Sequence, residues 1–155
     1  MPILDFLSQD AVVPSLRARD KKHALQELAA HSARHLPDLA ERDIFETLVQ
    51  RERLGSTGIG DGVAIPHGKL ARLGKLFGLV ARLEKPVDFD ALDGQPIDVA
   101  FLLLAPEGAG ADHLKALAQV ARVLREPGML ERIRTARDAT ALYALLAHGP
   151  TTQAA

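Results

Sequence analysis

The sequence predicts a single α/β domain in which helices cover a central β-sheet. A chain of 155 residues is long enough to bury one hydrophobic core. With 47% hydrophobic and 25% charged residues, its composition is that of an ordinary globular protein. Segments with the apolar spacing of amphipathic helices alternate with short apolar runs that indicate strands. This alternation is typical of an α/β domain.

Two helices are predicted in the first third of the chain. Residues 21–35 place apolar side chains on one helix face, and Pro37 ends this helix. Residues 41–53 form a second helix, which Gly55 closes. Arg51 lies in its last turn, where a cation suits the negative end of the helix dipole. The inward side of the second helix carries Ile44, Phe45, Leu48 and Val49.

Three strands are predicted in the middle of the chain. Residues 63–66 (VAIP) indicate a short strand, and residues 76–83 (LFGLVARL) indicate a longer one. Residues 97–105 (IDVAFLLLA) are almost all apolar, which is typical of a strand buried on both faces. Between the last two strands, residues 84–96 have the Pro, Asp and Gly content of a loop.

The last part of the chain is predicted to be helical. Residues 112–126 have a clear amphipathic spacing, and Asp112 is the expected N-cap of this helix. Two shorter helices follow at about residues 129–136 and 138–147.

The folded domain is expected to span residues 1–150. Gly149 and Pro150 follow the last helix and do not continue it. No internal repeat, linker or low-complexity segment divides the sequence. Residues 151–155 (TTQAA) are expected to be a disordered tail.

Composition and charge argue against several classes of function. The net charge is −1 and the chain has no basic block, so binding to nucleic acid is not indicated. No apolar run approaches the roughly 20 residues of a membrane helix, and the N-terminus lacks the positive region of a secretory signal. The chain has no cysteine, which excludes disulfides and thiolate metal sites. We therefore expect a cytoplasmic protein with no membrane insertion, metal or cofactor.

Residues 55–70 (GSTGIGDGVAIPHGKL) contain five glycines and form the least regular part of the sequence. They do not match a P-loop, because Leu70 stands where Ser or Thr is needed and the first glycine is missing. The GxGxG at residues 58–62 leads into a strand rather than a helix, so a dinucleotide site is not indicated either. These glycines can still let the backbone approach a bound anion closely, and Ser56 and Thr57 add hydroxyl donors.

His67 differs from the other histidines because its neighbours control its backbone. Pro66 fixes its own φ and favours an extended conformation at Ile65, while Gly68 leaves the far side of the histidine uncrowded. An imidazole at the end of a strand can present one ring nitrogen to a partner. From its position alone, a turn histidine without a chemical task is an equally good interpretation.

Residues 51–68 (RERLGSTGIGDGVAIPHG) resemble the active-site signature of the mannitol/fructose-type enzyme IIA domains of the phosphotransferase system. In that signature a loop of small residues runs into an A-hydrophobic-P-H-G segment whose histidine accepts a phosphoryl group. Residues 86–125 resemble the second half of the nitrogen-regulatory enzyme IIA, and the resemblance covers roughly residues 3–147. It implies the mannitol-type IIA fold, with a central mixed sheet flanked by helices. The nitrogen-regulatory branch is favoured because no transporter domain is attached.

The resemblance also implies which residues act. The phospho-accepting histidine of the family falls on His67, which would carry the phosphoryl group on its tele nitrogen, and a family arginine falls on Arg51. The second active-site histidine falls on His113. Arg51 offers a planar pair of donors that can bind two phosphate oxygens, and His113 lies at a helix start, where free N–H groups favour an anion.

Supporting roles at the phosphate are expected for Ser56, Thr57 and Gly68. Asp61 receives no role, because a carboxylate so near an incoming phosphate would repel it unless it points away.

By this resemblance the protein is a phosphocarrier that receives a phosphoryl group on His67 from a phosphohistidine on an HPr-like protein, the NPr of the nitrogen branch. The state of the histidine would govern binding to regulatory targets, which in the family include potassium transporters and sensor kinases. One alternative is a sugar-specific enzyme IIA that passes the phosphoryl group to a IIB domain. A distant alternative is a metal hydrolase that uses His67 and His113, although no acidic ligand pair accompanies them.

Overall fold

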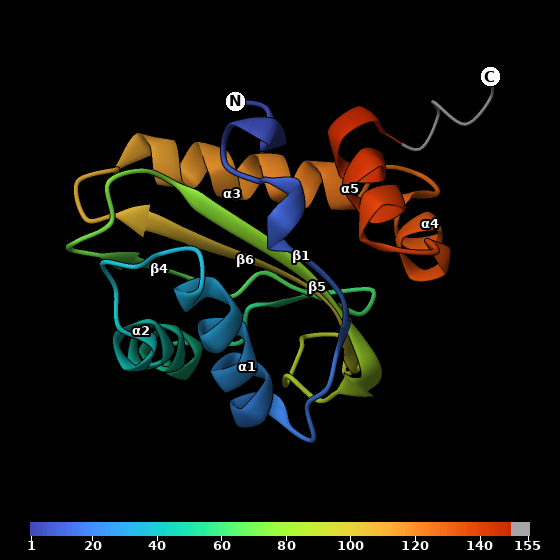
Figure 1. The fold of residues 1–155 in the computed structure, drawn as a ribbon. Coiled ribbons are helices and arrows are strands. Elements are labelled where there is room, and N and C mark those ends of the chain that lie inside the picture. Colours follow the sequence, from blue (N-terminus) through green and yellow to red (C-terminus); the bar gives the residue numbers. More distant parts are fainter. Residues whose placement is uncertain (150–155) are drawn as a thin grey trace.

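Helices cover both faces of a β-sheet in the computed structural model, which describes residues 1–149 (Figure 1). Two of them, α1 (Lys21–Ala33) and α2 (Glu41–Arg53), lie on one side of the sheet. On the other side lie α3 (Ala111–Leu124), α4 (Met129–Thr135) and α5 (Ala139–His148). Two short 3₁₀ turns, η1 (Ile3–Asp5) and η2 (Gln9–Ala11), precede the first strand. The predicted α/β architecture is confirmed.

Within residues 1–149 the sheet has six strands. They are β1 (Val12–Leu16), β2 (Gly58–Gly60), β3 (Val63–Ala64), β4 (His67–Leu70), β5 (Phe77–Val87) and β6 (Ile97–Pro106). Their order is β1-β5-β6-β3-β2, and β4 also pairs with β6. β6 runs antiparallel to β5 and parallel to β3 and β4, while β1 is parallel to β5 and β2 antiparallel to β3. The sheet is therefore mixed, as expected.

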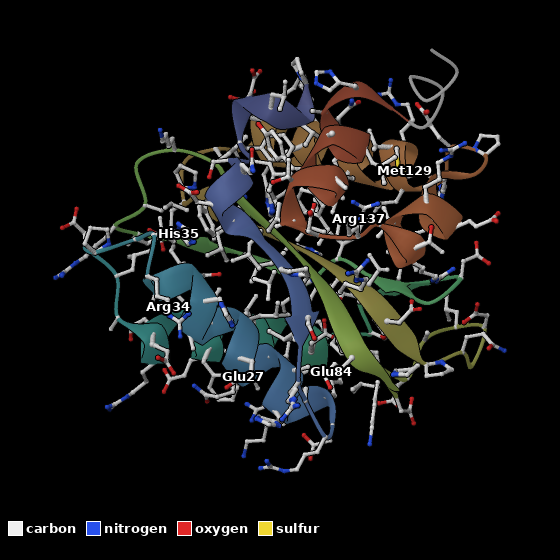
Figure 2. The ribbon with its side chains drawn as sticks, turned by 45° about the vertical axis from the view of Figure 1, so that its right-hand side comes forward. Glu27, Arg34, His35, Glu84, Met129 and Arg137 are labelled. Carbon is white, nitrogen blue, oxygen red and sulfur yellow. The ribbon has the colours of Figure 1, made fainter. Side chains whose placement is uncertain are left out.

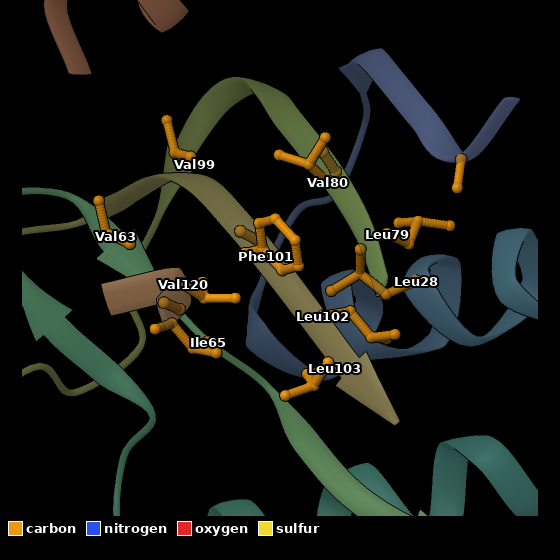
Figure 3. Close-up of a cluster of buried hydrophobic side chains, with 14 of the residues drawn as sticks. Leu28, Val63, Ile65, Leu79, Val80, Val99, Phe101, Leu102, Leu103 and Val120 are labelled. Atoms are coloured by element: carbon orange, nitrogen blue, oxygen red, sulfur yellow. The ribbon is translucent and has the colours of Figure 1, made fainter. Parts of the chain in front are cut away.

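The hydrophobic core is centred on β6, which has strands along both edges and helices on both faces. Phe101, Leu102 and Leu103 of this strand are completely buried. Side chains from both helical layers, such as Leu28 of α1 and Val120 of α3, belong to the same cluster (Figure 3). Burial from both sides explains why the segment is apolar at nearly every position rather than alternating.

Charged side chains lie outside this core. Glu27 of α1 is partly exposed, and Arg34 at the end of the same helix is exposed (Figure 2). Glu84 of β5 lies at the surface and pairs with Arg17, with 2.8 Å between the Glu84 Oε2 and Arg17 Nε atoms. Among the helices that the structure describes, none is both long enough and apolar enough for a membrane span.

The start of α3 differs from the prediction. Asp112 is not the N-cap: that position belongs to Gly110, and no side chain caps the helix. Gly110 has a φ of +52°, a conformation that side-chain-bearing residues rarely adopt, so the chain can turn sharply into the helix there. Asp112 instead lies in the first turn, where its charge suits the positive end of the helix dipole.

Several strand limits also differ from the prediction. β1 and β2 were not expected from the sequence, and β5 continues to Val87, inside the segment predicted as a loop. The strand predicted at residues 63–66 ends at Ala64, and His67 begins a new strand instead of following one. β1 and β4 become strands because they pair with β5 and β6, which are distant in sequence, whereas β2 forms a local pair with β3.

Candidate active site

The backbone of His67 is fixed at the edge of the sheet. β3 and β4 pair with the same side of β6 and are separated by Ile65 and Pro66. The Pro66 carbonyl accepts a hydrogen bond from the Leu103 N–H at 2.9 Å, and the Ile65 N–H donates to the Thr57 carbonyl at 2.9 Å. Proline, which has no N–H to donate, is tolerated at such an edge. His67 is therefore held in register opposite Leu103.

The hydrogen bonds of the His67 ring define its tautomer. Nδ1 lies 2.7 Å from the Ile65 carbonyl oxygen, which can only accept, so Nδ1 carries the proton. Nε2 therefore has a free electron pair, and the Arg51 Nε–H donates to it at 3.1 Å. Burial lowers the pKa of His67 below its usual value and the charge of Arg51 lowers it further, while the Ile65 carbonyl and Glu52 act in the opposite direction. The lowered pKa favours the neutral imidazole, in which Nε2 carries the electron pair that a nucleophile needs.

Arg51 reaches His67 because α2 packs closely on β4. Arg51 lies one turn beyond the buried Leu48, on the helix face that meets the sheet. A Cβ atom at Gly68 would lie well within 3.0 Å of the Thr47 Cγ2 atom, so only glycine allows this approach. Arg51 Nη1 also donates to the Gly55 carbonyl at 2.7 Å. Gly68 thus brings the guanidinium to the ring, rather than merely leaving space beside it.

His113 approaches His67 from the other helical layer. It lies on the buried face of α3 with Ala116 and Val120 and is 7% exposed. The centroids of the two imidazole rings are 5.6 Å apart. Its Nε2 atom is buried and has no hydrogen-bond partner among residues 1–149. Burial, together with the nearby His67 and Lys69, lowers the pKa of His113, which favours a neutral ring.

The pleat of β4 explains how both layers meet at one histidine. Side chains alternate between the two faces of a strand, and Gly68 faces Thr47 of α2. His67, one residue earlier, therefore faces the side of α3, where His113 lies. Arg51 reaches it from α2 because β4 is at the edge of the sheet. The structure thus brings together the three residues that the resemblance selects.

Ser56 and Thr57 use their hydroxyl groups within the loop. The Ser56 hydroxyl donates to the Phe89 carbonyl and accepts from the Gly58 N–H at 3.0 Å. The Thr57 hydroxyl donates to the Glu52 carboxylate. In this arrangement neither hydroxyl proton is directed to a phosphate on His67, in contrast to the expectation from sequence. Both residues hold the loop in place instead.

Asp61 lies in the turn between β2 and β3, whereas His67 follows the other end of β3. Its side chain is exposed, and its φ is +58°. Its N–H donates to Asp93 at 3.0 Å, and its carbonyl accepts from Arg134. This placement agrees with the absence of a role at the phosphate.

Glu52 is the residue near the site that the sequence interpretation missed. Its side chain is only 6% exposed and pairs with Lys21, with 2.8 Å between the Glu52 Oε1 and Lys21 Nζ atoms. It also accepts from the N–H of Thr57 at 3.2 Å. A signal was present: Glu52 follows the buried Leu48 by four residues, which places a charge on the apolar face of α2.

Apolar side chains are exposed beside the site. Four surface cavities of the described chain are all lined by residues other than His67. Leu54, next to the end of α2, is 85% exposed, and Leu114, next to His113, is 69% exposed. Within residues 1–149 no group of three His, Asp or Glu side chains is placed to hold a metal ion.

Comparisons with known proteins place the chain in a family. Residues 5–149 match the family described as the phosphoenolpyruvate-dependent sugar phosphotransferase system, EIIA 2. The chain is similar to a nitrogen regulatory protein of Bradyrhizobium diazoefficiens, with 57% identity over 99% of this chain and 100% of that protein. It is also similar to the crystal structure of the nitrogen regulatory protein IIA-Ntr from Neisseria meningitidis, with a TM-score of 0.87 and 37% identity, covering 93% of this chain and 98% of that one.

The mannitol IIA of Escherichia coli shares the fold, with a TM-score of 0.76 at 18% identity over 91% of this chain and 99% of that one. The mannitol-type fold that the resemblance implied is therefore confirmed, and so is the resemblance itself. The chain belongs to the EIIA 2 family of the phosphoenolpyruvate-dependent sugar phosphotransferase system.

Proposed function

We propose that the protein accepts a phosphoryl group on Nε2 of His67 from a phosphohistidine of an HPr-like carrier such as NPr, and that this modification governs its binding to regulatory targets. The observation that carries the proposal is the state of the imidazole. Its Nδ1–H is held by the Ile65 carbonyl, which leaves Nε2 unprotonated, with its electron pair accepting from Arg51 and the buried His113 nearby. Similarity to nitrogen regulatory proteins over nearly the whole chain supports the regulatory branch over a sugar-specific one.

The transfer step needs a nucleophile and charge stabilisation. The electron pair of His67 Nε2 forms the new N–P bond, while the electrons of the breaking N–P bond return to the imidazole nitrogen of the donor. Positive charge then develops on the His67 ring, and the hydrogen bond from Nδ1–H to the Ile65 carbonyl stabilises it. Such transfers depend mainly on positioning and on electrostatic stabilisation of the phosphoryl oxygens.

Arg51 changes partner during this step. In the unphosphorylated protein its Nε–H donates to the electron pair that must attack phosphorus. Arg51 therefore releases Nε2 and donates to the phosphoryl oxygens instead. The bond from Nη1 to the Gly55 carbonyl keeps the guanidinium within reach while this exchange occurs. His113 supplies a further donor to the same group from the opposite side.

The exposed apolar side chains beside the site suit a protein donor. Leu54 and Leu114 are exposed apolar side chains next to the elements that carry Arg51 and His113. Short-lived contacts between carrier proteins bury on the order of 1,200 Å² or less in total. We therefore assign the surroundings of His67 to brief docking by a small protein. The cytoplasmic location of this exchange stays a prediction from the sequence.

Labelling with phosphoenolpyruvate, enzyme I and the HPr-like carrier tests this function. The protein should gain one phosphoryl group that acid removes and alkali spares, because protonation of the nitrogen makes it a good leaving group. His67→Ala should abolish the label. An acid-stable label, or one that survives His67→Ala but is lost in His113→Ala, would contradict the assignment.

Variants of the two supporting residues test their roles. His113→Ala and Arg51→Ala should still become labelled, but about 10²–10³-fold more slowly, because a positioned donor is lost while the nucleophile remains. The Arg51→Ala reaction should depend more strongly on salt, since the remaining charges act over longer distances. Unchanged rates in both variants would show that neither Arg51 nor His113 takes part in the reaction.

The regulatory part is tested by comparing captured partners. His67→Ala imitates the unphosphorylated state, and His67→Asp places a negative charge at the same position. Potassium transporters or sensor kinases, identified by mass spectrometry, should associate with one variant and not with the other. Equal binding to both variants would contradict control by phosphorylation. Transfer of the label to a IIB domain would favour the sugar-specific alternative.

A further inference from the structure

We infer that Glu52 is a positioning residue that sets the orientation of both ring nitrogens of His67 through the loop that follows α2. This inference rests on the proposed function, because its effect on activity is measured as phosphoryl acceptance. Glu52 does not touch the reacting atoms itself. It acts on residues that do.

The carboxylate of Glu52 is a buried anchor. It is 6% exposed and forms an ion pair with Lys21 at 2.8 Å. Thr57 donates to it twice, from its N–H at 3.2 Å and from its hydroxyl. A carboxylate withdrawn from water is costly unless it is paired and hydrogen-bonded in this way. The side chain therefore ties Thr57 firmly to the end of α2.

From Thr57, one path leads to Nδ1 of His67. The Thr57 carbonyl accepts the Ile65 N–H at 2.9 Å. The Ile65 carbonyl, in turn, accepts the Nδ1–H of His67 at 2.7 Å. Each link is a hydrogen bond of normal length. The carboxylate thus fixes, through two residues, the carbonyl that defines the tautomer of the nucleophile.

A second path leads to Nε2. The loop from Leu54 to Thr57 is closed at one end by the Gly55 N–H, which donates to the Glu52 carbonyl at 3.1 Å. Its other end is held by the carboxylate of the same residue. The Gly55 carbonyl between them accepts from Arg51 Nη1 at 2.7 Å, while Arg51 Nε donates to His67. A shift of this loop would therefore move Arg51 relative to the ring.

Lys21 and Phe89 complete the anchor from outside the loop. The Lys21 ammonium lies 5.2 Å from the centroid of the Phe89 ring and donates to the Phe89 carbonyl at 3.3 Å. The Ser56 hydroxyl donates to the same carbonyl. Glu52 is therefore held by α1 and by the segment after β5 at once. This arrangement is more extensive than capping the end of one helix would require.

The test compares Glu52→Gln with a matched pair at Thr57. Glu52→Gln keeps the shape but loses the charge, and Thr57→Val keeps the shape but loses the hydroxyl. Thr57→Ser keeps the hydroxyl and is the control. We expect Glu52→Gln and Thr57→Val to lower the maximal rate of phosphoryl acceptance about tenfold, the low end of the effect of groups that orient a metal ligand through a hydrogen bond. The donor concentration that gives half of that rate should not change, and Thr57→Ser should react like the wild type.

Nuclear magnetic resonance of the unphosphorylated protein gives a readout that stability alone would not move. The Arg51 Nε–H proton should be protected from exchange in the wild type and in Thr57→Ser, because it is bonded to His67. It should exchange faster in Glu52→Gln and Thr57→Val well below their melting temperatures. The inference would be overturned if Glu52→Gln or Thr57→Val were less stable but kept a protected Arg51 Nε–H proton and the wild-type rate of phosphoryl acceptance.

The same design separates this inference from the proposed function. If the wild type acquires no phosphohistidine, the proposed function fails, whereas the exchange measurement still decides whether Glu52 positions Arg51. If the wild type is labelled on His67 but both variants are unaffected, the function stands and the role of Glu52 is wrong. If the Glu52→Gln variant does not fold, the measurements on Thr57→Val alone decide whether Glu52 has this positioning role.

Discussion

Replacing Gly68 by alanine should damage both stability and phosphoryl acceptance. The added methyl group would lie well within 3.0 Å of the Thr47 Cγ2 atom and 3.7 Å from the Thr47 Cβ atom. Carbon atoms normally approach to about 3.5–4.0 Å, so α2 and β4 must separate by on the order of 1 Å unless the threonine gives way. Threonine is branched at Cβ and has little rotational freedom in a helix, so the helix itself is expected to move.

The size of both effects follows from this displacement. Overpacking costs about 1–3 kcal/mol. Alanine also restricts the unfolded chain more than glycine does, which raises the free energy of unfolding by about 0.4–1 kcal/mol. We therefore expect the free energy of unfolding to fall by about 1–2 kcal/mol. The Arg51 Nε–His67 Nε2 distance of 3.1 Å would lengthen beyond hydrogen-bonding range. A misplacement of about 1 Å can slow a reaction by up to about 10²-fold.

Urea unfolding and the labelling rate measure the two effects, and a second substitution tests their cause. Thr47→Ala removes Cγ2 and leaves the two Cβ atoms 3.7 Å apart, an ordinary contact, so the double variant should regain most of both losses. Gly74→Ala is the matched control, because a Cβ there meets nothing within 4 Å. If Gly68→Ala behaves like Gly74→Ala, or if Thr47→Ala brings no recovery, the reasoning about close packing is wrong.

Three further predictions concern stability. The pKa values of His67 and His113 are lowered in the folded protein, so the unfolded chain binds more protons below about pH 6.5. The free energy of unfolding should therefore fall as the pH drops from about 6.5 towards the lowered pKa values. His113→Gln should weaken this dependence. A free energy of unfolding that does not change with pH in urea titrations would contradict the prediction. Asp20→Ala should lower the free energy of unfolding by about 1 kcal/mol, because Asp20 caps α1. Asp112→Ala should lower it less, because Asp112 caps no helix. Calorimetry that ranks the two variants the other way would refute this. Leu102→Ala in the centre of β6 should cost about 2–5 kcal/mol in urea unfolding, and a smaller loss would mean that the core can collapse around it.

Long segments with a clear pattern could be predicted from the sequence. The apolar faces of α2 and α3 and the continuous apolar run of β6 depend on spacing that is local in the chain. β1 could not be predicted in this way, because its pairing with β5 is decided by residues far along the chain. β2 pairs locally with β3, but its segment Gly58–Gly60 (GIG) carries no alternating apolar pattern that would indicate a strand. Asp112 shows the same limit at a helix end: its residue type suits a cap, but the conformation of Gly110 decides where the helix begins.

The site was predictable only in part for the same physical reason. The unusual backbone around His67 is visible in the order Pro66, His67, Gly68. By contrast, the proximity of Arg51 and His113 follows from two helices on opposite faces of the sheet, and only the family resemblance indicated it. Sequence shows which groups can donate hydrogen bonds, but not where they are directed.

Because β4 is paired with β6 in a fixed register, the number of residues just before His67 cannot change, whereas the segment after Leu70 can accept insertions. His67 is paired with Leu103, and positions 67 and 68 face opposite sides of the sheet. Removing one residue between Ala64 and His67 would turn the imidazole toward α2 and place Lys69 where Gly68 now meets Thr47, so no single deletion there can preserve the site. Beyond Leu70 the chain leaves the ladder for an exposed bend, where extra residues at Gly74 would leave the register untouched. An affinity tag or a reporter peptide therefore belongs in that bend.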